Sequence, residues 1–350
     1  MLTARASKIK FLSVRRGQEA DGLSAAEISL LTWAATRTAE TRGPRMVLLL
    51  MALAQVVVFG VRADPGVQRA GGEGVSQLKV AVAQPLVVPG DVKRNIQNMQ
   101  PMVAEAARRG AELIVFSECG INGCDLNGVG KAAAISLDDP ALEQVARMAR
   151  KHRIAIVAGL YEKQRDHVFN TAAVFFPDGR RVIQRKHKVD LDAVKARAES
   201  AERQPTYFEV KGFRCAILIC SDAGIPGVFD ELATNRCDAA IVITAGAGSD
   251  TMGFHQSELA NPERRKKYLD LAVSVLSRES LERCLMLHQA LIACNQAGWD
   301  ARSGYFHPGH SSVTDRTGEV TALIPIRFVF EHLRPDLAVG LITRPINEQP

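Results

Sequence analysis

The sequence contains no CxxC pair, although it has seven cysteines in 350 residues. This absence argues against a zinc ribbon and against the redox motif of a thioredoxin-type protein. Cys119 and Cys124 have a spacing that two metal ligands could use, but no second pair accompanies them, so they are better interpreted as loop or core cysteines. Because the number of cysteines is odd, at least one thiol stays outside any disulfide within a monomer.

The part of the chain that is expected to fold has almost no surplus of positive charge. The whole sequence has a formal net charge of +6, but residues 1–77 contain 10 Lys and Arg against 6 Asp and Glu, which leaves 34 against 32 for the remainder. Nucleic-acid binding needs a basic surface. The sequence therefore predicts no nucleic-acid partner.

The first 77 residues contain one long run without a charged residue, from Met46 to Val61. Two arginines precede this run, and small residues lie three positions and one position before Asp64. This arrangement is typical of a secretory signal peptide cleaved after Ala63. The run is short for a membrane span. An uncleaved anchor and a buried helix are the alternatives.

These features divide the chain into four parts. Residues 1–45 are an N-terminal extension of uncertain status, 46–63 a signal peptide or anchor, 64–77 a linker, and 78–345 the folded domain. Met46 is a second candidate for the translation start. We expect an exported protein of the periplasm or cell envelope, whose only membrane contact lies within residues 46–61; without export it would be cytoplasmic.

From Leu78 onward, apolar strand-like segments alternate with segments of helical spacing, and two hairpins interrupt the series. Asp91 and Asp139 are placed to begin helices, and Gly110 to end the first of them. This order predicts an α/β fold in which helices cover the outer faces of sheets. The predicted strands are Leu78–Ala83, Glu112–Phe116, Ile154–Tyr161, Val168–Phe176, Arg181–Lys188, Phe213–Cys220, Ala239–Thr244, Leu285–Cys294, Ser311–Thr314 and Val320–Ile324, and the later predicted helices are Val228–Thr234 and Glu263–Ser277.

Three reactive side chains lie at or just beyond the ends of predicted strands: Glu118, Lys186 and Cys220. Sheet proteins commonly gather functional groups at strand ends. In a hydrolytic set of this kind, the carboxylate takes the thiol proton, the thiolate attacks a carbonyl or nitrile carbon, and the ammonium stabilises the developing charge. Such chemistry requires no metal or other cofactor.

Each of the three residues also has an ordinary structural interpretation. Cysteine is often a core residue, and Glu118 and Lys186 would ordinarily be solvated. Cys215, five positions before Cys220, is predicted to point to the opposite face of the strand and to be inert. A rival hypothesis is a Cys–His hydrolase oriented by Asn295, with its imidazole from one of His255, His288, His307 and His310.

Six segments, in the right order, resemble motifs of the nitrilase or carbon-nitrogen hydrolase superfamily from about residue 78 to residue 345. They are the opening strand, the glutamate, lysine and cysteine motifs, and two closing strands. These are Leu78–Gln84, Val115–Glu118, Arg185–Val189, Leu218–Asp222, Ala293–Gly298 and Pro308–Asp315.

The resemblance implies a four-layer αββα sandwich of the nitrilase type that pairs with further copies as a homodimer or higher homo-oligomer. It also implies that Glu118 is the general base and acid, that Lys186 stabilises the tetrahedral intermediate, and that Cys220 is the nucleophile that forms a thioester. The amide of Ser221 is then a candidate oxyanion donor. Nitrilases proper tend to have Trp-Glu after the cysteine, whereas Ser221-Asp222 follows here. This difference favours a thiol amidohydrolase acting on a small carboxamide or N-carbamoyl compound.

Two assignments stay open at this stage. Lys188 shares a strand face with Lys186, although the motif register favours Lys186. Glu199 and Glu202 are the candidates for the supporting glutamate of the family, in a segment that is short and lacks its usual Phe-x-Pro-Gly stretch. These departures keep a second hypothesis, that the protein is a catalytically silent relative that binds a ligand or serves in assembly.

Overall fold

The computed structural model describes residues 75–124, 128–187, 201–203, 205–246, 261–263, 280–300, 305–325 and 336–346. The chain divides into two units between Ala70 and Gly71, and every described residue belongs to the second unit. The predicted signal peptide and the segments before it lie outside the described residues. Among the helices that are described, none is long and apolar enough to cross a membrane.

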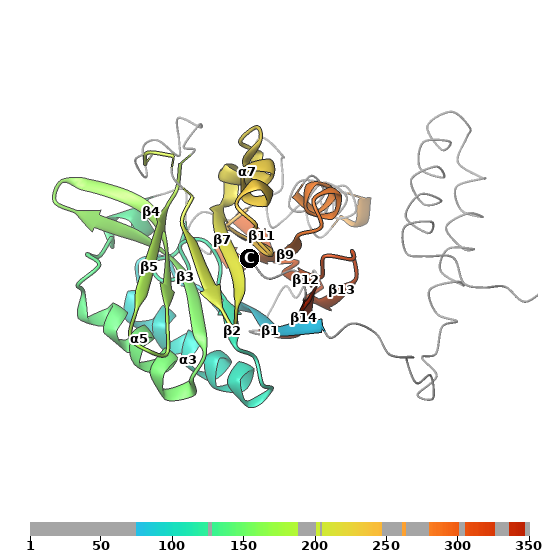
Figure 1. The fold of residues 1–350 in the computed structure, drawn as a ribbon. Helices are drawn as coiled ribbons and strands as arrows, with labels where there is room; N and C mark the ends of the chain where they lie inside the picture. The colour runs from blue at the N-terminus through green and yellow to red at the C-terminus, as the bar shows by residue number, and fades with distance from the viewer. Residues whose placement is uncertain are drawn as a thin grey trace, which may run out of the picture. The chain divides into compact units, whose positions relative to one another are not determined.

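Two six-stranded mixed sheets form the centre of this unit (Figure 1). The strand order of the first sheet is β14-β1-β2-β3-β4-β5, and that of the second is β13-β12-β9-β8-β7-β6. The first sheet consists of β1 (Val75–Gln84), β2 (Leu113–Val115), β3 (Ala155–Gln164), β4 (His167–Phe175), β5 (Arg181–Arg185) and β14 (Asp336–Pro345). The second consists of β6 (Tyr207–Val210), β7 (Phe213–Ile219), β8 (Ala239–Thr244), β9 (Ala290–Asn295), β12 (Ser312–Thr314) and β13 (Val320–Leu323), and β10 (Ala297–Asp300) pairs with β11 (Tyr305–Pro308) separately.

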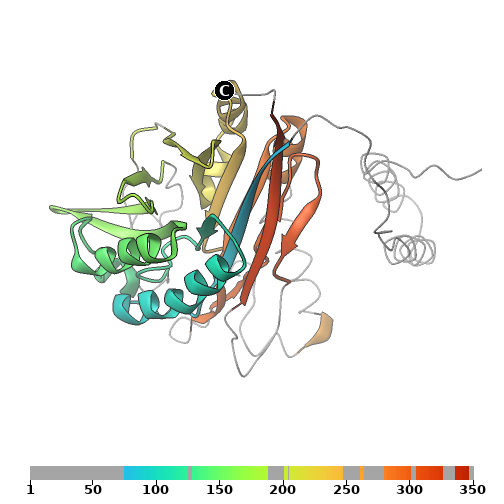
Figure 2. The same cartoon turned by 60° about the horizontal axis from the view of Figure 1, so that its bottom comes forward.

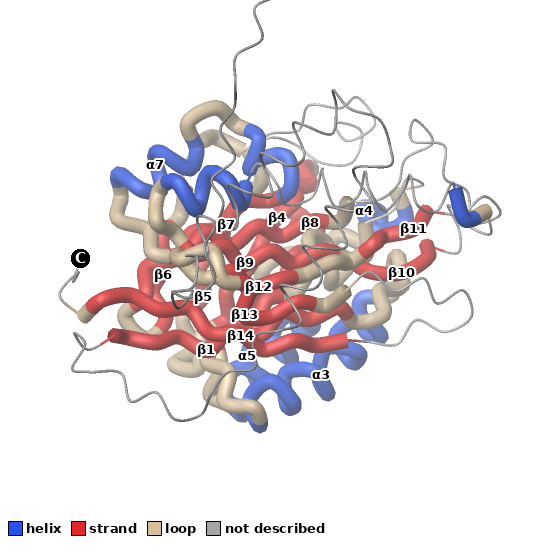
Figure 3. The backbone as a smooth tube through the Cα atoms, turned by 90° about the vertical axis from the view of Figure 1, so that its right-hand side faces the viewer, coloured by secondary structure: helices blue, strands red, loops and turns tan. Residues whose placement is uncertain are grey.

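Helices cover the outer face of each sheet, so the layers are helix, sheet, sheet, helix. In Figure 3, α3 and α5 lie on one side of the strands and α7 on the other. This arrangement confirms the predicted four-layer αββα sandwich. The described helices are α3 (Val92–Arg108), α4 (Val129–Ala132), α5 (Pro140–His152) and α7 (Val228–Thr234), with the 3₁₀ turn η1 at Cys220–Gly224.

The strands form these layers because their side chains alternate between two apolar surroundings. In β7, Ile217 and Ile219 enter the core between the sheets, whereas Ala216 and Leu218 pack toward α7. In β1, Leu78, Val80 and Val82 enter the same inter-sheet core, whereas Ala81 and Ala83 pack toward α3 and α5. From Val80 onward both faces of β1 are therefore buried.

The predicted helix starts and the first hairpin are confirmed. The Asp91 side chain accepts a hydrogen bond from the amide of Arg94 at the start of α3, and the Asp139 side chain accepts one from Ala141 at the start of α5. Strands β4 and β5 pair antiparallel through the turn that contains Asp178. The predicted helix Glu263–Ser277 lies almost entirely outside the described residues.

Three predictions about strands need correction. Residues 280–286 are helical, and β9 begins at Ala290 rather than Leu285. Strand β7 ends at Ile219, so Cys220 belongs to the following turn. The sequence analysis did not predict β14, which pairs antiparallel with β1 along its whole length, as the adjacent blue and dark red strands of Figure 2 show.

Candidate active site

The ends of β2, β5 and β7 bring the three predicted residues into one region. Glu118 lies three residues beyond β2, Lys186 directly follows β5, and Cys220 directly follows β7. β2 and β5 belong to the first sheet and β7 to the second, so the residues approach one another from two sheets. The fold therefore brings together the three side chains that the sequence placed at strand ends.

A buried ion pair joins Glu118 and Lys186. The Lys186 Nζ atom donates to Glu118 Oε1 at 2.7 Å. Lys186 is only 4% exposed and Glu118 only 3%. A charge this far from water is stable only when it is paired and hydrogen-bonded. The pair is therefore a strong constraint on the position of both side chains.

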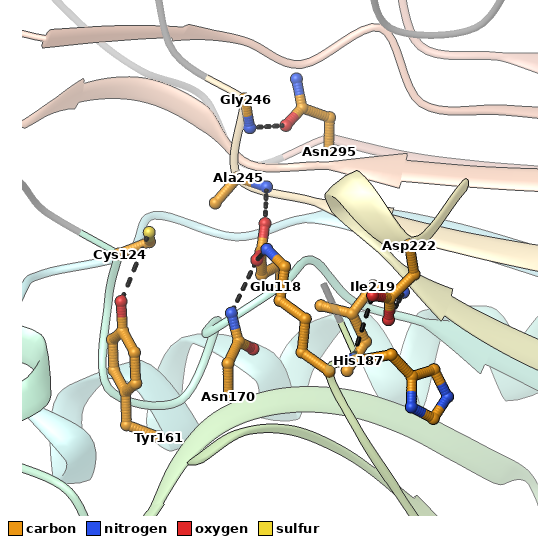
Figure 4. A network of polar contacts seen from close by, with 11 residues as sticks. Glu118, Cys124, Tyr161, Asn170, His187, Ile219, Asp222, Ala245, Gly246 and Asn295 are labelled. Carbon is orange, nitrogen blue, oxygen red and sulfur yellow. Dashed lines mark hydrogen bonds and ion pairs between the residues drawn. The ribbon is translucent and has the colours of Figure 1, made fainter. Parts of the chain in front are cut away.

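Asn170, on β4, holds both members of this pair and was not predicted. Its Nδ2 donates to Glu118 Oε1 at 2.7 Å, while its backbone carbonyl accepts the amide of Lys186 at 2.8 Å. The amide of Ala245 donates to the other carboxylate oxygen of Glu118 at 2.8 Å. Figure 4 shows Asn170 and Ala245 on opposite sides of Glu118. An asparagine in the middle of the strand-forming segment His167–Phe175 was the signal in the sequence.

The surroundings keep Glu118 and Lys186 charged. Burial raises the pKa of Glu118, but the Lys186 charge and the hydrogen bonds from Lys186, Ala245 and Asn170 outweigh it and hold that pKa below its ordinary value. Burial likewise lowers the pKa of Lys186, but the charge and hydrogen bond of Glu118, together with the negative charge that Cys220 carries when it is ionised, outweigh it, so the net pKa is raised. Near neutral pH the pair is thus carboxylate and ammonium.

Cys220 is half-buried and has backbone φ of 53°, in the left-handed region. A non-glycine residue in this region marks a constrained turn and is common at functional sites. Burial raises the pKa of its thiol to about 12; the negative charge of Glu118 adds to the increase and Lys186 opposes it. The resting thiol is therefore neutral, and the carboxylate beside it is a base that can remove its proton.

Asp222 joins the lysine segment to the cysteine segment. Its Oδ1 accepts the amide of His187 at 3.0 Å, and its Oδ2 accepts the amide of Ile219 at 3.2 Å. Figure 4 shows its side chain between these two residues. The sequence analysis named Asp222 only as part of the cysteine motif, because a contact between two sheets leaves no periodic signal.

The open assignments are resolved only in part. Lys188 and Glu199 lie outside the described residues. Glu202 is described with an exposed side chain, and its backbone carbonyl contacts the His187 ring at 3.0 Å. Lys186 is the lysine that the structure places against Glu118.

The residues of the rival Cys–His hypothesis lie in different environments. His255 is outside the described residues, and His288 is exposed. Burial lowers the pKa of His310. The Asn295 Oδ1 atom accepts the amide of Gly246 at 3.0 Å, which holds the segment next to Ala245. The side chains that shift the pKa of Cys220 include those of Glu118 and Lys186.

Cys215 does not lie on the opposite face from Cys220, as parity along the strand had predicted. Both contact the core between the sheets, because the regular strand ends at Ile219 and the left-handed backbone redirects Cys220. Burial does raise the pKa of the Cys215 thiol well above its ordinary value, in keeping with an inert residue. All seven cysteines are described and none forms a disulfide.

Cys119 and Cys124 lie beside Tyr161 rather than in a metal cluster. The Cys124 Sγ atom is 3.7 Å from the Tyr161 hydroxyl. Within the described ranges, no group of three or more His, Cys, Asp or Glu side chains is placed to hold a metal ion. Both cysteines belong to the segment that follows β2 and carries Glu118.

Comparison with known proteins identifies the family. The sequence profile described as carbon-nitrogen hydrolase matches residues 79–326. An omega-amidase of Danio rerio is 26% identical over 255 residues, which cover 70% of this chain and 83% of that protein. An aliphatic nitrilase of Rhodococcus rhodochrous is 30% identical over 128 residues, and this match spans 33% of the chain and only 35% of that nitrilase.

Solved structures show the same fold. The crystal structure of an amidase from a Nesterenkonia species superposes with a TM-score of 0.60 at 20% identity, covering 77% of this chain and 90% of the amidase. Its sandwich architecture is the one built above from the alternation of buried side chains.

Proposed function

Since the chain belongs to the carbon-nitrogen hydrolase family, whose members act on C–N bonds other than peptide bonds, we propose that it is a thiol amidohydrolase. Its substrate is a small carboxamide or N-carbamoyl compound, and it releases ammonia through an acyl-enzyme on Cys220. The observation that carries this proposal is the buried Glu118–Lys186 ion pair beside the thiol of Cys220. Cys220 lies in the turn after β7 and has a left-handed backbone.

In the first half-reaction, Glu118 takes the proton of the Cys220 thiol as the sulfur attacks the carbonyl carbon. The C–O double bond opens to an oxyanion, which the Lys186 ammonium and the Ser221 amide stabilise. The C–N bond then breaks, and the leaving nitrogen takes the proton that Glu118 received. Ammonia departs and a thioester remains on Cys220.

In the second half-reaction, water attacks the thioester. Glu118 removes a proton from this water, and the collapse of the second tetrahedral intermediate breaks the C–S bond. The sulfur recovers a proton from Glu118, and a carboxylic or carbamic acid is released. Because the resting thiol has a pKa of about 12, each proton transfer occurs with substrate bound rather than beforehand.

Charge surroundings favour this division of roles. The hydrogen bonds to Glu118 keep it ionised and ready to accept a proton. The positive charge of Lys186 lowers the pKa of the thiol, which means that it stabilises negative charge at the sulfur and beside it. A neutral nucleophile, a charged base and a fixed cation are thus all present before substrate arrives.

The test is ammonia release across a panel of aliphatic amides, aliphatic nitriles and N-carbamoyl amino acids. We expect activity on an amide or carbamoyl compound, a loss of at least 1,000-fold in Cys220→Ala, on the order of what removal of a nucleophile costs, and an acyl adduct on Cys220 after acid quenching. Cys215→Ala, which removes a buried thiol from β7, the strand that precedes Cys220, is the matched control and should keep activity within about threefold. Turnover by Cys220→Ala would overturn the proposal.

A wild-type protein that releases no ammonia from any member of the panel, and that forms no acyl adduct on Cys220 with any of them, would favour the alternative. The chain would then be a silent relative that binds a ligand or serves in assembly.

A further inference from the structure

The Asp222 side chain contacts both the backbone next to Lys186 and the backbone next to Cys220. The residue is 0% exposed. One carboxylate oxygen accepts the amide of His187, the residue after Lys186, and the other accepts the amide of Ile219, the residue before Cys220. The carboxylate therefore bridges His187, two positions after the end of β5 in the first sheet, and Ile219, the last residue of β7 in the second.

A turn-forming role explains only half of this geometry. The bond to Ile219 is local, three residues back, and it helps to close the turn in which Cys220 adopts a φ of 53°. The bond to His187 spans 35 residues and contributes nothing to that turn. A carboxylate that only capped the turn would not need to reach the other sheet.

The Lys186 backbone is held on both sides of its Cα atom. Its own amide donates to the carbonyl of Asn170 at 2.8 Å, and the next amide donates to Asp222 at 3.0 Å. The side chain then has one direction in which to meet Glu118. Since Asp222 also holds the turn of Cys220, it determines how far the ammonium lies from the sulfur.

We propose that Asp222 is a positioning residue that sets the separation of the Lys186 ammonium from the Cys220 sulfur by binding one backbone amide on each side. The proposal rests on the proposed function of this site. It requires a carboxylate, because both oxygens accept from N–H groups, and an asparagine at this position would turn its own NH₂ group toward one of them.

The first test is Asp222→Asn. We expect kcat to fall about 10- to 100-fold with KM within about threefold, since a displacement of about 1 Å at reacting groups can cost 100-fold while ground-state binding is kept. The rate at which iodoacetamide alkylates Cys220 should fall by about 10-fold as well, because the thiolate loses part of its stabilisation by Lys186.

Asp315→Asn is the matched control. Asp315 is another buried carboxylate whose two oxygens accept from the amide and hydroxyl of Thr343, at 2.8 and 2.9 Å. It ties the turn after β12 to β14, away from the three reactive residues. Its loss should lower the melting temperature about as much as Asp222→Asn does, with kcat and alkylation rate unchanged within about twofold.

The positioning role would be overturned if Asp222→Asn and Asp315→Asn lost kcat equally. It would also be overturned if Asp222→Asn kept the kcat and the alkylation rate of the wild type. If Asp222→Asn does not fold, Asp222→Glu and Asp315→Glu replace the pair, and the same difference in kcat is required. Alkylation needs no substrate, so it tests Asp222 even if ammonia release fails. Conversely, an active Cys220→Ala protein would contradict the proposed function but would leave the contacts of Asp222 with His187 and Ile219 unaffected.

Discussion

At the scale of single residues, Asn170 links the base to the lysine. Its side chain and the Lys186 ammonium donate to the same carboxylate oxygen of Glu118. Burial raises the pKa of Glu118, and the charge and hydrogen bond of Lys186 lower it most. The hydrogen bond from Asn170 lowers this pKa further. The protonation state of the base therefore depends on a neighbour that has no direct role in the chemistry.

Asn170→Asp is expected to move the acid limb of kcat/KM to higher pH by about one unit or more, because a second carboxylate against Oε1 raises the pKa of Glu118 and can share its proton. The pH dependence of ammonia release between pH 3 and pH 8 measures this. Glu162→Gln, which alters a buried carboxylate paired with Arg185 at a distance from the thiol, is the control and should leave the limb in place. An unshifted limb in Asn170→Asp would contradict the argument.

At the scale of secondary-structure elements, β3 packs closely against the turn that carries Glu118. At Gly159 the distance between the two backbones leaves no room for a side chain. A Cβ atom at Gly159 would lie 2.4 Å from the Cys119 nitrogen, 2.6 Å from the Ser117 oxygen and 2.7 Å from the Glu118 Cα. These are backbone atoms, which cannot move aside as a flexible side chain would. The glycine therefore allows the strand and the turn to pack, and it fixes the depth of the carboxylate.

Gly159→Ala is expected to destabilise the protein by about 1–3 kcal/mol, the usual cost of overpacking, and to reduce kcat by displacing Glu118. Thermal unfolding and ammonia release measure the two effects. In Gly224→Ala the new Cβ meets no atom within 4 Å, so its melting temperature should stay near that of the wild type. Wild-type stability in Gly159→Ala would show that the turn can move at little cost.

Elements whose signals are local were predicted well. The Asp91 and Asp139 caps marked α3 and α5, and the β4–β5 turn marked the hairpin, because each of these structures depends on a few consecutive residues. The strand start predicted at Leu285 was wrong because a short apolar run does not distinguish a strand from the end of a helix. The pairing of β14 with β1 depends on residues more than 250 positions apart.

At the scale of the whole molecule, the Glu118–Lys186 pair contributes stability over a wide pH range. The pKa of Glu118 is lowered from 4.5, so its contribution is complete above that value and is lost as the pH falls through the lower folded-state pKa. The pKa of Lys186 is raised from 10.5, so its contribution is complete below that value and is lost as the pH rises through the higher one. Between these limits the contribution is constant.

We therefore compare the melting temperatures of the wild type and of the double variant Glu118→Gln/Lys186→Met. The wild-type value is expected to fall relative to that of the variant only below pH 4.5 and above pH 10.5. Differential scanning calorimetry of the two proteins from pH 3 to pH 11 measures the difference. A difference that changed between pH 6 and pH 8 would contradict the assigned charges.

The N-terminal region carries a separate prediction for the whole chain. If residues 46–63 are a signal peptide, the mature protein starts at Asp64 and functions outside the cytoplasm, where Cys220 must stay reduced. N-terminal sequencing of protein from its native host measures this. A start before Met46, or soluble protein that keeps the run from Met46 to Val61, would refute the export.

The family, most of the strands and helices, and the segments that bring Glu118, Lys186 and Cys220 together could be inferred from the chain alone, because they depend on local periodicity, caps and short motifs. The buried contacts of Asn170 and Asp222, the turned backbone of Cys220 and the partner of β1 could not. They arise where segments far apart in the chain meet between two sheets, and burial there demands a hydrogen-bond partner for every charge and amide. No spacing along the chain encodes which partner that will be.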